Sequence, residues 1–334
     1  MSDVILPPLF GRPLRQVHLL GAGGMGMVPL GLYLVQRGFK VSAEDDSWNP
    51  ATRALLEQAG VELTAANGRP AGTDLVVFSP AVAHTHPARA LATVQGIEQV
   101  RRGEMLAEIT RDRKLVAVVG SHGKTTTTAM LITALQQSGF DCGWVLGGLF
   151  SDHALPPARD AAEWLVAEVD ESDGTIGLFA PEITLTVNLD WDHADHYAKP
   201  GDLEKEFAAL FARTKQAVFM SDACVLSRTL LSEFPPHASV ITFGVIGDYQ
   251  CAHSEESAAE IELKLGGRFA LSRARVRARG EFNAHNAVAA LAVAQHLGAA
   301  ITPDSLAAFS GVRRRQTLLY SSSTLAIFED YAHH

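Results

Sequence analysis

The sequence is short of cysteine and of positive charge, and both shortages narrow the classes of protein it can represent. Three cysteines, Cys142, Cys224 and Cys251, are too few and too widely spaced for a disulfide framework or a Cys-x-x-Cys zinc site. The 37 acidic residues outnumber the 28 basic ones and give a net charge of −9. This balance argues against general binding to nucleic acid or to a membrane surface. We therefore expect a protein of the reducing cytoplasm.

Long apolar runs are also missing. No stretch approaches the roughly 20 residues that span a bilayer. Residues 1–11 lack the basic and apolar segments of a signal peptide, so we expect no membrane partner. There is no internal repeat or low-complexity tract. At 334 residues and 47% hydrophobic content, the chain is long enough for two or more domains. Its oligomeric state is left open.

Strand-like and helix-like segments alternate along most of the chain, which is typical of α/β proteins with parallel sheets. We expect a first, Rossmann-like domain over residues 1–113, a second α/β domain over 114–312, and a linker at 313–334. The clearest predicted strands are 17–20, 40–42, 75–78, 116–119, 164–167, 183–187, 217–220 and 260–265. The clearest predicted helices are 27–37, 52–58, 203–211 and 284–297.

A glycine turn follows the apolar strand 116–119. Gly120 and Gly123 frame it, and a helix opens on Lys124 and Thr125. Backbone N–H groups in such a turn point at phosphate oxygens, the lysine reaches the β- and γ-phosphates, and the threonine hydroxyl binds Mg²⁺. A simple helix cap is the alternative, but it leaves a lysine and four threonines in the first turns unexplained. Only two residues separate the glycines, so the loop is a shortened variant of the usual phosphate loop.

A second glycine-rich turn, Gly21–Gly26, follows the first predicted strand, and acidic residues lie about 20 positions further on, at 44–46. This pattern suits the pyrophosphate of NAD, FAD or a UDP-sugar. A dehydrogenase is one hypothesis. Hydride transfer needs no triphosphate, however, so two phosphate sites favour an enzyme that uses ATP on a nucleotide-linked substrate.

Acidic and histidine residues follow two of the predicted strands. At 168–173, Glu171 or Asp170 is expected to complete a Mg²⁺ shell opposite Thr125, with a solvated acidic loop as the alternative. At 188–196, His193 or Asp192 is a candidate for a second metal.

Polar residues near the end of the chain have two explanations each. Asn283 and Asn286 are suited to an adenine edge, or Asn283 caps its helix. Arg313–Arg315 can neutralise a γ-phosphate or decorate a surface loop.

Together these motifs resemble the Mur ligase family, ATP-dependent enzymes that form the amide bonds of the peptidoglycan stem peptide. The resemblance implies a UDP-sugar-binding domain, a central ATP-binding domain and a C-terminal domain of which this chain holds only the start. The implied ATP residues are Gly120, His122, Gly123, Lys124, Thr125, Thr126, Asn283, Asn286, Arg315 and Asp330. The implied UDP-sugar residues are Gly21, Gly23, Gly24, Met25, Gly26, Asp45, Ser79 and Arg102. The implied Mg²⁺ ligands are Thr125, Glu171 and His193, and the implied catalytic residues are Lys124, Glu171, His193 and Arg315.

Within the family, the first glycine turn and His122 are similar to the branch that joins L-alanine to UDP-N-acetylmuramate. We expect the activity of this branch. The segments 192–195, 313–316 and 330–333 resemble instead a branch that adds a recycled tripeptide to the same sugar, which is the alternative. The resemblance implies an acyl-phosphate intermediate, and a fragment that is catalytically incomplete alone. Residues 207–211 lack the modified lysine of other branches, consistent with both of these. A UDP-sugar-binding module without turnover is the alternative from another class.

Overall fold

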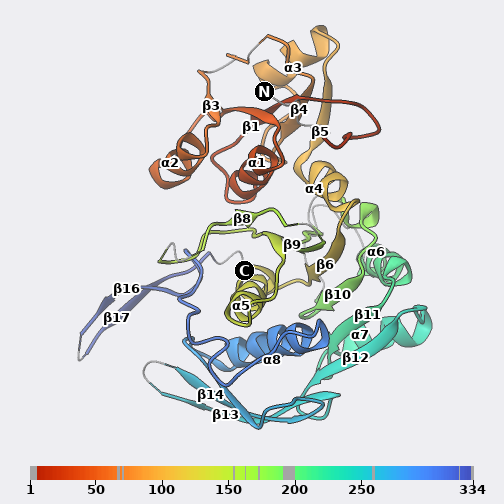
Figure 1. Ribbon diagram of the computed structural model, residues 1–334, viewed down its shortest axis with the longest axis vertical. Coiled ribbons are helices and arrows are strands. Elements are labelled where there is room, and N and C mark those ends of the chain that lie inside the picture. The colour runs from red at the N-terminus through yellow and green to blue at the C-terminus, as the bar shows by residue number, and fades with distance from the viewer. Residues whose placement is uncertain are drawn as a thin grey trace.

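The chain folds around two open sheets, each flanked by helices, and a projecting hairpin (Figure 1). The computed structural model describes residues 6–65, 68–69, 71–152, 155–161, 163–171, 174–190, 200–257, 260–322 and 324–331. Among these residues, no helix is both long and apolar enough to cross a membrane.

The first sheet is entirely parallel, with strand order β3-β2-β1-β4-β5. Its strands are β1 (Gln16–Leu20), β2 (Lys40–Glu44), β3 (Glu62–Leu63), β4 (Leu75–Phe78) and β5 (Glu98–Arg101). Its helices are α1 (Met27–Gln36), α2 (Pro50–Gln58), α3 (Pro87–Val94) and α4 (Arg102–Thr110). All of β1 is buried, as expected for a central parallel strand. Gly38, at φ +91°, ends the turn after α1, where a side chain would be strained.

The second sheet has ten strands in the order β15-β14-β13-β12-β11-β10-β6-β9-β7-β8. The central strands are β6 (Lys114–Val119), β7 (Gly143–Val145), β9 (Trp164–Glu168), β10 (Ile183–Thr186), β11 (Ala217–Ser221) and β12 (Ser239–Gly244). These six pair in parallel. The outer strands are β8 (Ala158–Arg159), β13 (Tyr249–Glu256), β14 (Ile261–Gly267) and β15 (Arg273–Val276). β8 pairs antiparallel with β7, β13 runs parallel to β12, and β14 and β15 continue the sheet antiparallel.

Alternation along β6 divides the core of this region between the two faces of the sheet. Val116 and Val118 pack on the side of α5 (Lys124–Gln137) and α8 (Glu281–His296), which lie side by side in Figure 1. Leu115, Ala117 and Val119 pack on the side of α6 (Pro200–Arg213) and α7 (Val225–Glu233). The apolar cluster on this second side continues into the core of the first sheet.

The strand order reverses at β6, which has β9 on one side and β10 on the other. Ligands of open α/β sheets bind outside the carboxyl ends of the strands at such a reversal. The segments that follow β6, β9 and β10 are the phosphate-type loop, the acidic segment and the segment beginning at Asn188. The topology therefore gathers three predicted site segments at one edge.

The strands and helices expected from the sequence are present, and several short elements were not anticipated. Among these are α3, α4, α7 and a 3₁₀ turn, η1 (Ile176–Leu178). The segment after residue 312 forms an antiparallel hairpin of β16 (Thr317–Ser321) and β17 (Ala326–Glu329). The predicted division after residue 113 falls between α4 and β6.

Candidate active site

One cleft of about 1100 Å³ receives both glycine turns, one from each sheet. The predicted site residues that line it are Gly23, Gly24, Met25, Gly26, Ser79, Arg102, His122, Gly123, Lys124, Thr125, Thr126, Asn283, Asn286, Arg315 and Asp330. Gly21, Asp45, Gly120 and Glu171 lie behind this lining and support it through the contacts described below. His193 and Asp192 lie outside the described residues.

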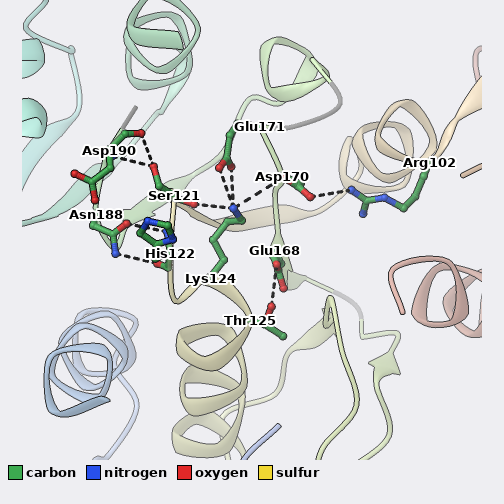
Figure 2. Close-up of polar contacts among 11 residues, drawn as sticks. Arg102, Ser121, His122, Lys124, Thr125, Glu168, Asp170, Glu171, Asn188 and Asp190 are labelled. Carbon is green, nitrogen blue, oxygen red and sulfur yellow. Dashed lines mark hydrogen bonds and ion pairs between the residues drawn. The ribbon is translucent and has the colours of Figure 1, made fainter. Parts of the chain in front are cut away.

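The loop after β6 needs its glycines. Gly120 adopts φ +134°, and a Cβ there would lie 2.6 Å from the carbonyl oxygen of Asn188. Gly123 adopts φ +80° directly before α5. Asn188 holds the loop from the next strand, since its Oδ1 accepts the His122 N–H at 2.8 Å and its Nδ2 donates to the His122 carbonyl at 2.9 Å (Figure 2). No role for Asn188 is predicted from the sequence, although its place just after a strand is a usable signal.

Lys124 is nearly buried and surrounded by oxygen. Its Nζ donates to the Gly120 carbonyl at 2.8 Å and lies 3.0 Å from both carboxylate oxygens of Glu171 (Figure 2). An oxygen of Asp170 is 3.9 Å away. Burial lowers the pKa of Lys124, but the carboxylates of Glu171, Asp170 and Glu168 raise it and prevail. The lysine therefore stays protonated and available to an anion.

The carboxylate opposite Thr125 is that of Glu168. The Thr125 hydroxyl donates to Glu168 Oε1 at 3.0 Å, while Glu168 Oε2 is buried without a hydrogen-bond partner (Figure 2). Burial raises the pKa of Glu168, with Lys124 opposing the shift. A hydroxyl beside an unpaired buried carboxylate oxygen suits a hard divalent cation. The expected partner, Glu171, instead contacts Lys124, and the described residues contain no group of three or more histidine, cysteine or acidic side chains arranged to hold a metal ion.

The first glycine turn is held by hydrogen bonds to the end of β2 and the residue after it. Gly21 and Ala22 donate their N–H groups to the Glu44 carbonyl, and Gly23 donates to Asp45 Oδ2 at 2.8 Å. Asp45 thus shapes the turn and does not line the cleft. Arg102 lies against Gly26, where an added Cβ would be 3.2 Å from Arg102 Cδ.

The far end of the cleft is built by α8 and the segment after residue 312. Gly280 is the N-cap of α8, so the helix-capping explanation for Asn283 is wrong. Asn283 is buried, and its Nδ2 donates to the Arg279 carbonyl at 2.8 Å and to Gln316 Oε1 at 3.1 Å. Asn286, also buried, donates to Asn283 Oδ1 at 3.2 Å. The two asparagines therefore form one polar unit on the cleft wall.

Arg315 sits between two residues with strained backbone. Arg314 adopts φ +61° and Gln316 φ +48°, in the left-handed region that side chains disfavour. Arg315 Nη1 donates to the Tyr331 carbonyl at 3.0 Å, and its guanidinium lies over the Tyr331 ring. The arginine thus reaches the cleft while bound to the end of the hairpin.

Comparison with known proteins assigns both sheets to one family. The chain matches the Mur ligase family catalytic domain over residues 16–114 and the Mur ligase middle domain over residues 118–294. It is 31% identical to a UDP-N-acetylmuramate–L-alanine ligase of Methylocella silvestris, covering 96% of this chain and 71% of the relative. The corresponding ligase of a Bradyrhizobium strain is 32% identical, covering 97% of this chain and 72% of the relative.

Solved structures agree with this comparison. The UDP-N-acetylmuramate-alanine ligase MurC of Thermotoga maritima superposes with a TM-score of 0.82 at 25% identity, covering 96% of this chain and 74% of that one. A murein peptide ligase of Psychrobacter arcticus superposes with a TM-score of 0.77 at 24% identity, covering 96% and 73%. The second likeness concerns the fold alone.

Proposed function

Because the chain belongs to the Mur ligase family, whose members are ATP-dependent carbon–nitrogen ligases, we propose that it joins L-alanine to UDP-N-acetylmuramate. The observation that carries the proposal is the shared cleft, which is lined both by a phosphate loop and by a second glycine turn from a different sheet. In a hydride-transferring enzyme the loop at Gly120–Lys124 would have no function, because hydride transfer needs no triphosphate. We also propose the division into domains after residue 113, and the cytoplasm as the place of action.

A carboxylate is a poor electrophile, and this chemical fact explains the need for ATP. In the proposed reaction, a lactyl carboxylate oxygen attacks the γ-phosphorus, ADP leaves, and an acyl phosphate forms. The amine of L-alanine then attacks the acyl carbon, and inorganic phosphate leaves. The positive charge of Lys124 stabilises the transferring phosphoryl group, as does that of Arg315 once it turns from Tyr331. Positioning of the two substrates supplies the rest of the rate acceleration.

The donor set beside the phosphate loop fits Mg²⁺. Thr125 and Glu168 would hold the ion, which when bound neutralises charge on the phosphate oxygens. His193 is retained as a proposed second ligand. Glu171 is better described as the partner of Lys124. The remaining predicted ATP and UDP-sugar residues are proposed to contact those two ligands. Asp45 is the exception, because it contributes by holding the first glycine turn in its conformation.

The test is phosphate release by the full-length protein with ATP, Mg²⁺ and UDP-N-acetylmuramate, comparing L-alanine with the tripeptide L-alanyl-γ-D-glutamyl-meso-diaminopimelate. Release that requires L-alanine would support the proposal. Release with the tripeptide alone would replace it with the recycling reaction. Binding of the UDP-sugar without release in either mixture would replace it with a binding module.

A further inference from the structure

One carboxylate lies between the two halves of the cleft. Asp170 follows β9 of the second sheet, and its Oδ2 is 3.9 Å from Nη2 of Arg102, which begins α4 beside the first sheet (Figure 2). Its Oδ1 is 3.9 Å from Nζ of Lys124 in the phosphate loop. A single side chain thus contacts one cation from each glycine-turn site.

Both cations are mostly buried and in contact with neighbouring residues. The Arg102 side chain is 15% exposed and lies on Gly26 of the first turn. The Lys124 side chain is 11% exposed and is fixed by Glu171 and the Gly120 carbonyl. Charges that are this far removed from water need a nearby opposite charge. Asp170, at 33% exposure, supplies one to both while remaining open to the cleft.

We propose that Asp170 is a positioning residue, a shared counter-ion that keeps Arg102 and Lys124 directed at the same part of the cleft. The inference rests on the proposed function, because it assigns these two cations to the two anionic substrates. Bringing a substrate carboxylate up to a triphosphate places like charges together, so the spacing of the cations that offset them matters. Asp170 fixes that spacing, and its own negative charge repels each substrate.

This arrangement predicts opposite effects on binding and on turnover. In Asp170→Asn the side chain keeps its shape and loses its charge. The affinities for UDP-N-acetylmuramate and for a non-hydrolysable ATP analogue should each rise about three- to tenfold, a modest effect because the ion pairs are partly exposed. The kcat should fall about tenfold, because Asp170 no longer links Arg102 to Lys124 and the distance between the two cations is less well defined. If Asp170 only stabilised the fold, its substitution would weaken binding of both ligands.

Calorimetric titration of each ligand, alone, into the purified full-length protein measures the two affinities, and phosphate release measures kcat. Asp141→Asn is the matched control, since it removes an exposed carboxylate that pairs with Arg159 away from the cleft. Asp170→Glu restores the charge and should return both affinities to within about twofold of the parent values.

Unchanged or weakened affinities in Asp170→Asn, with a circular-dichroism melt like that of the parent, would overturn the inference. So would tightened binding with unchanged kcat. If Asp170→Asn does not fold, tighter binding by Asp170→Glu than by the parent overturns it. The ATP-analogue titration needs no sugar, so it tests Asp170 even if the parent fails to bind UDP-N-acetylmuramate, a failure that would contradict the proposed function separately.

Discussion

Lys124 combines deep burial with a full positive charge, and the carboxylates around it make this combination stable. Glu171 is 1% exposed and contacts the ammonium with both oxygens. Removing one member of a buried ion pair commonly costs about 3–5 kcal/mol. Glu171 therefore stabilises a charged lysine at the loop after β6.

We predict that Lys124→Ala lowers ATP-dependent phosphate release by about 100- to 1000-fold, the usual effect of deleting one charge-stabilising donor. Affinity for UDP-N-acetylmuramate should stay within about twofold, because its proposed contacts lie on the first glycine turn. Phosphate release and calorimetric titration measure the two effects. Lys215→Ala, which breaks a surface ion pair with Glu182, is the control and should retain full activity. Normal release by Lys124→Ala would contradict the assignment of the phosphate loop.

We predict that substitutions of Glu168 and Glu171 have different effects on the binding of Mg²⁺. In Glu168→Gln, Mg²⁺ should no longer strengthen binding of the ATP analogue, since the unpaired carboxylate oxygen beside Thr125 is gone. In Glu171→Gln the strengthening by Mg²⁺ should persist, because this side chain contacts Lys124. Titrating the analogue with and without Mg²⁺ measures both. The reverse pattern would return the metal role to Glu171.

The acidic segment was predictable from the sequence, but the carboxylate within it that contacts Thr125 was not. Several carboxylates stand within six residues there, and a loop has no fixed periodicity from which to infer direction. Glu168, however, still belongs to β9, where Val166 faces the α5 side of the sheet. Alternation places Glu168 on that side too, next to Thr125. The direction of a carboxylate side chain can thus be predicted within the strand but not in the loop that follows it.

At the scale of elements, the long periodic segments were predictable and the short ones were not. Composition alone predicts the apolar strands β1 and β6 and the alanine-rich helix α8. By contrast, β8 has two residues, pairs with β7 and lies against α1. Such elements depend on tertiary contacts that no local pattern encodes.

The contact between α1 and the second sheet region is polar and specific. Arg37, at the end of α1, has an 8% exposed side chain whose guanidinium bonds both oxygens of Asp112, at 2.6 and 3.3 Å. Gln36 exchanges hydrogen bonds with the backbone at Ala158 and Asp160. These contacts tie the first sheet's helix to the segment before β6 and to β8.

We predict that Arg37→Ala lowers the free energy of unfolding by about 2 kcal/mol, the range for hydrogen bonds between charged groups. Arg37→Lys should recover only part of this, since an ammonium cannot bond both oxygens in the same plane. Urea denaturation measures the change. Arg53→Ala, which breaks an exposed pair with Glu57 in α2, should cost less than about 1 kcal/mol. Equal losses of unfolding free energy in Arg37→Ala and Arg53→Ala would show that burial of Arg37 does not strengthen its ion pair.

For the molecule as a whole, one apolar cluster extends across both sheets. It contains Val17 and Leu19 of β1 together with Leu115 and Ala117 of β6. Regions that share a core lose it together, and the polar contacts of α1 add to this coupling. The relative placement of the two glycine turns is thus set by packing, which explains why the sequence could predict each turn but not the cleft they share.

We predict a single cooperative unfolding transition for the two sheets. Native-state hydrogen exchange should give the same opening free energy, within about 1 kcal/mol, for backbone amides of β1 and β6. Mass spectrometry of peptides covering the two strands measures both values. A separate, lower value for β1 would show that the first sheet opens independently and that the shared cluster does not couple them.

The contact between α5 and α8 also determines which changes the chain can tolerate. Gly123, just before α5, has so little room that a Cβ would lie 3.0 Å from Oδ1 of Asn286 on α8. The buried face of α8 is mainly alanine, including Ala287 and Ala290, and any larger side chain there would push the asparagines away from the phosphate loop. A saturation scan should therefore find a stripe of alanines as intolerant as the glycines of the loop, although none of them lines the cleft.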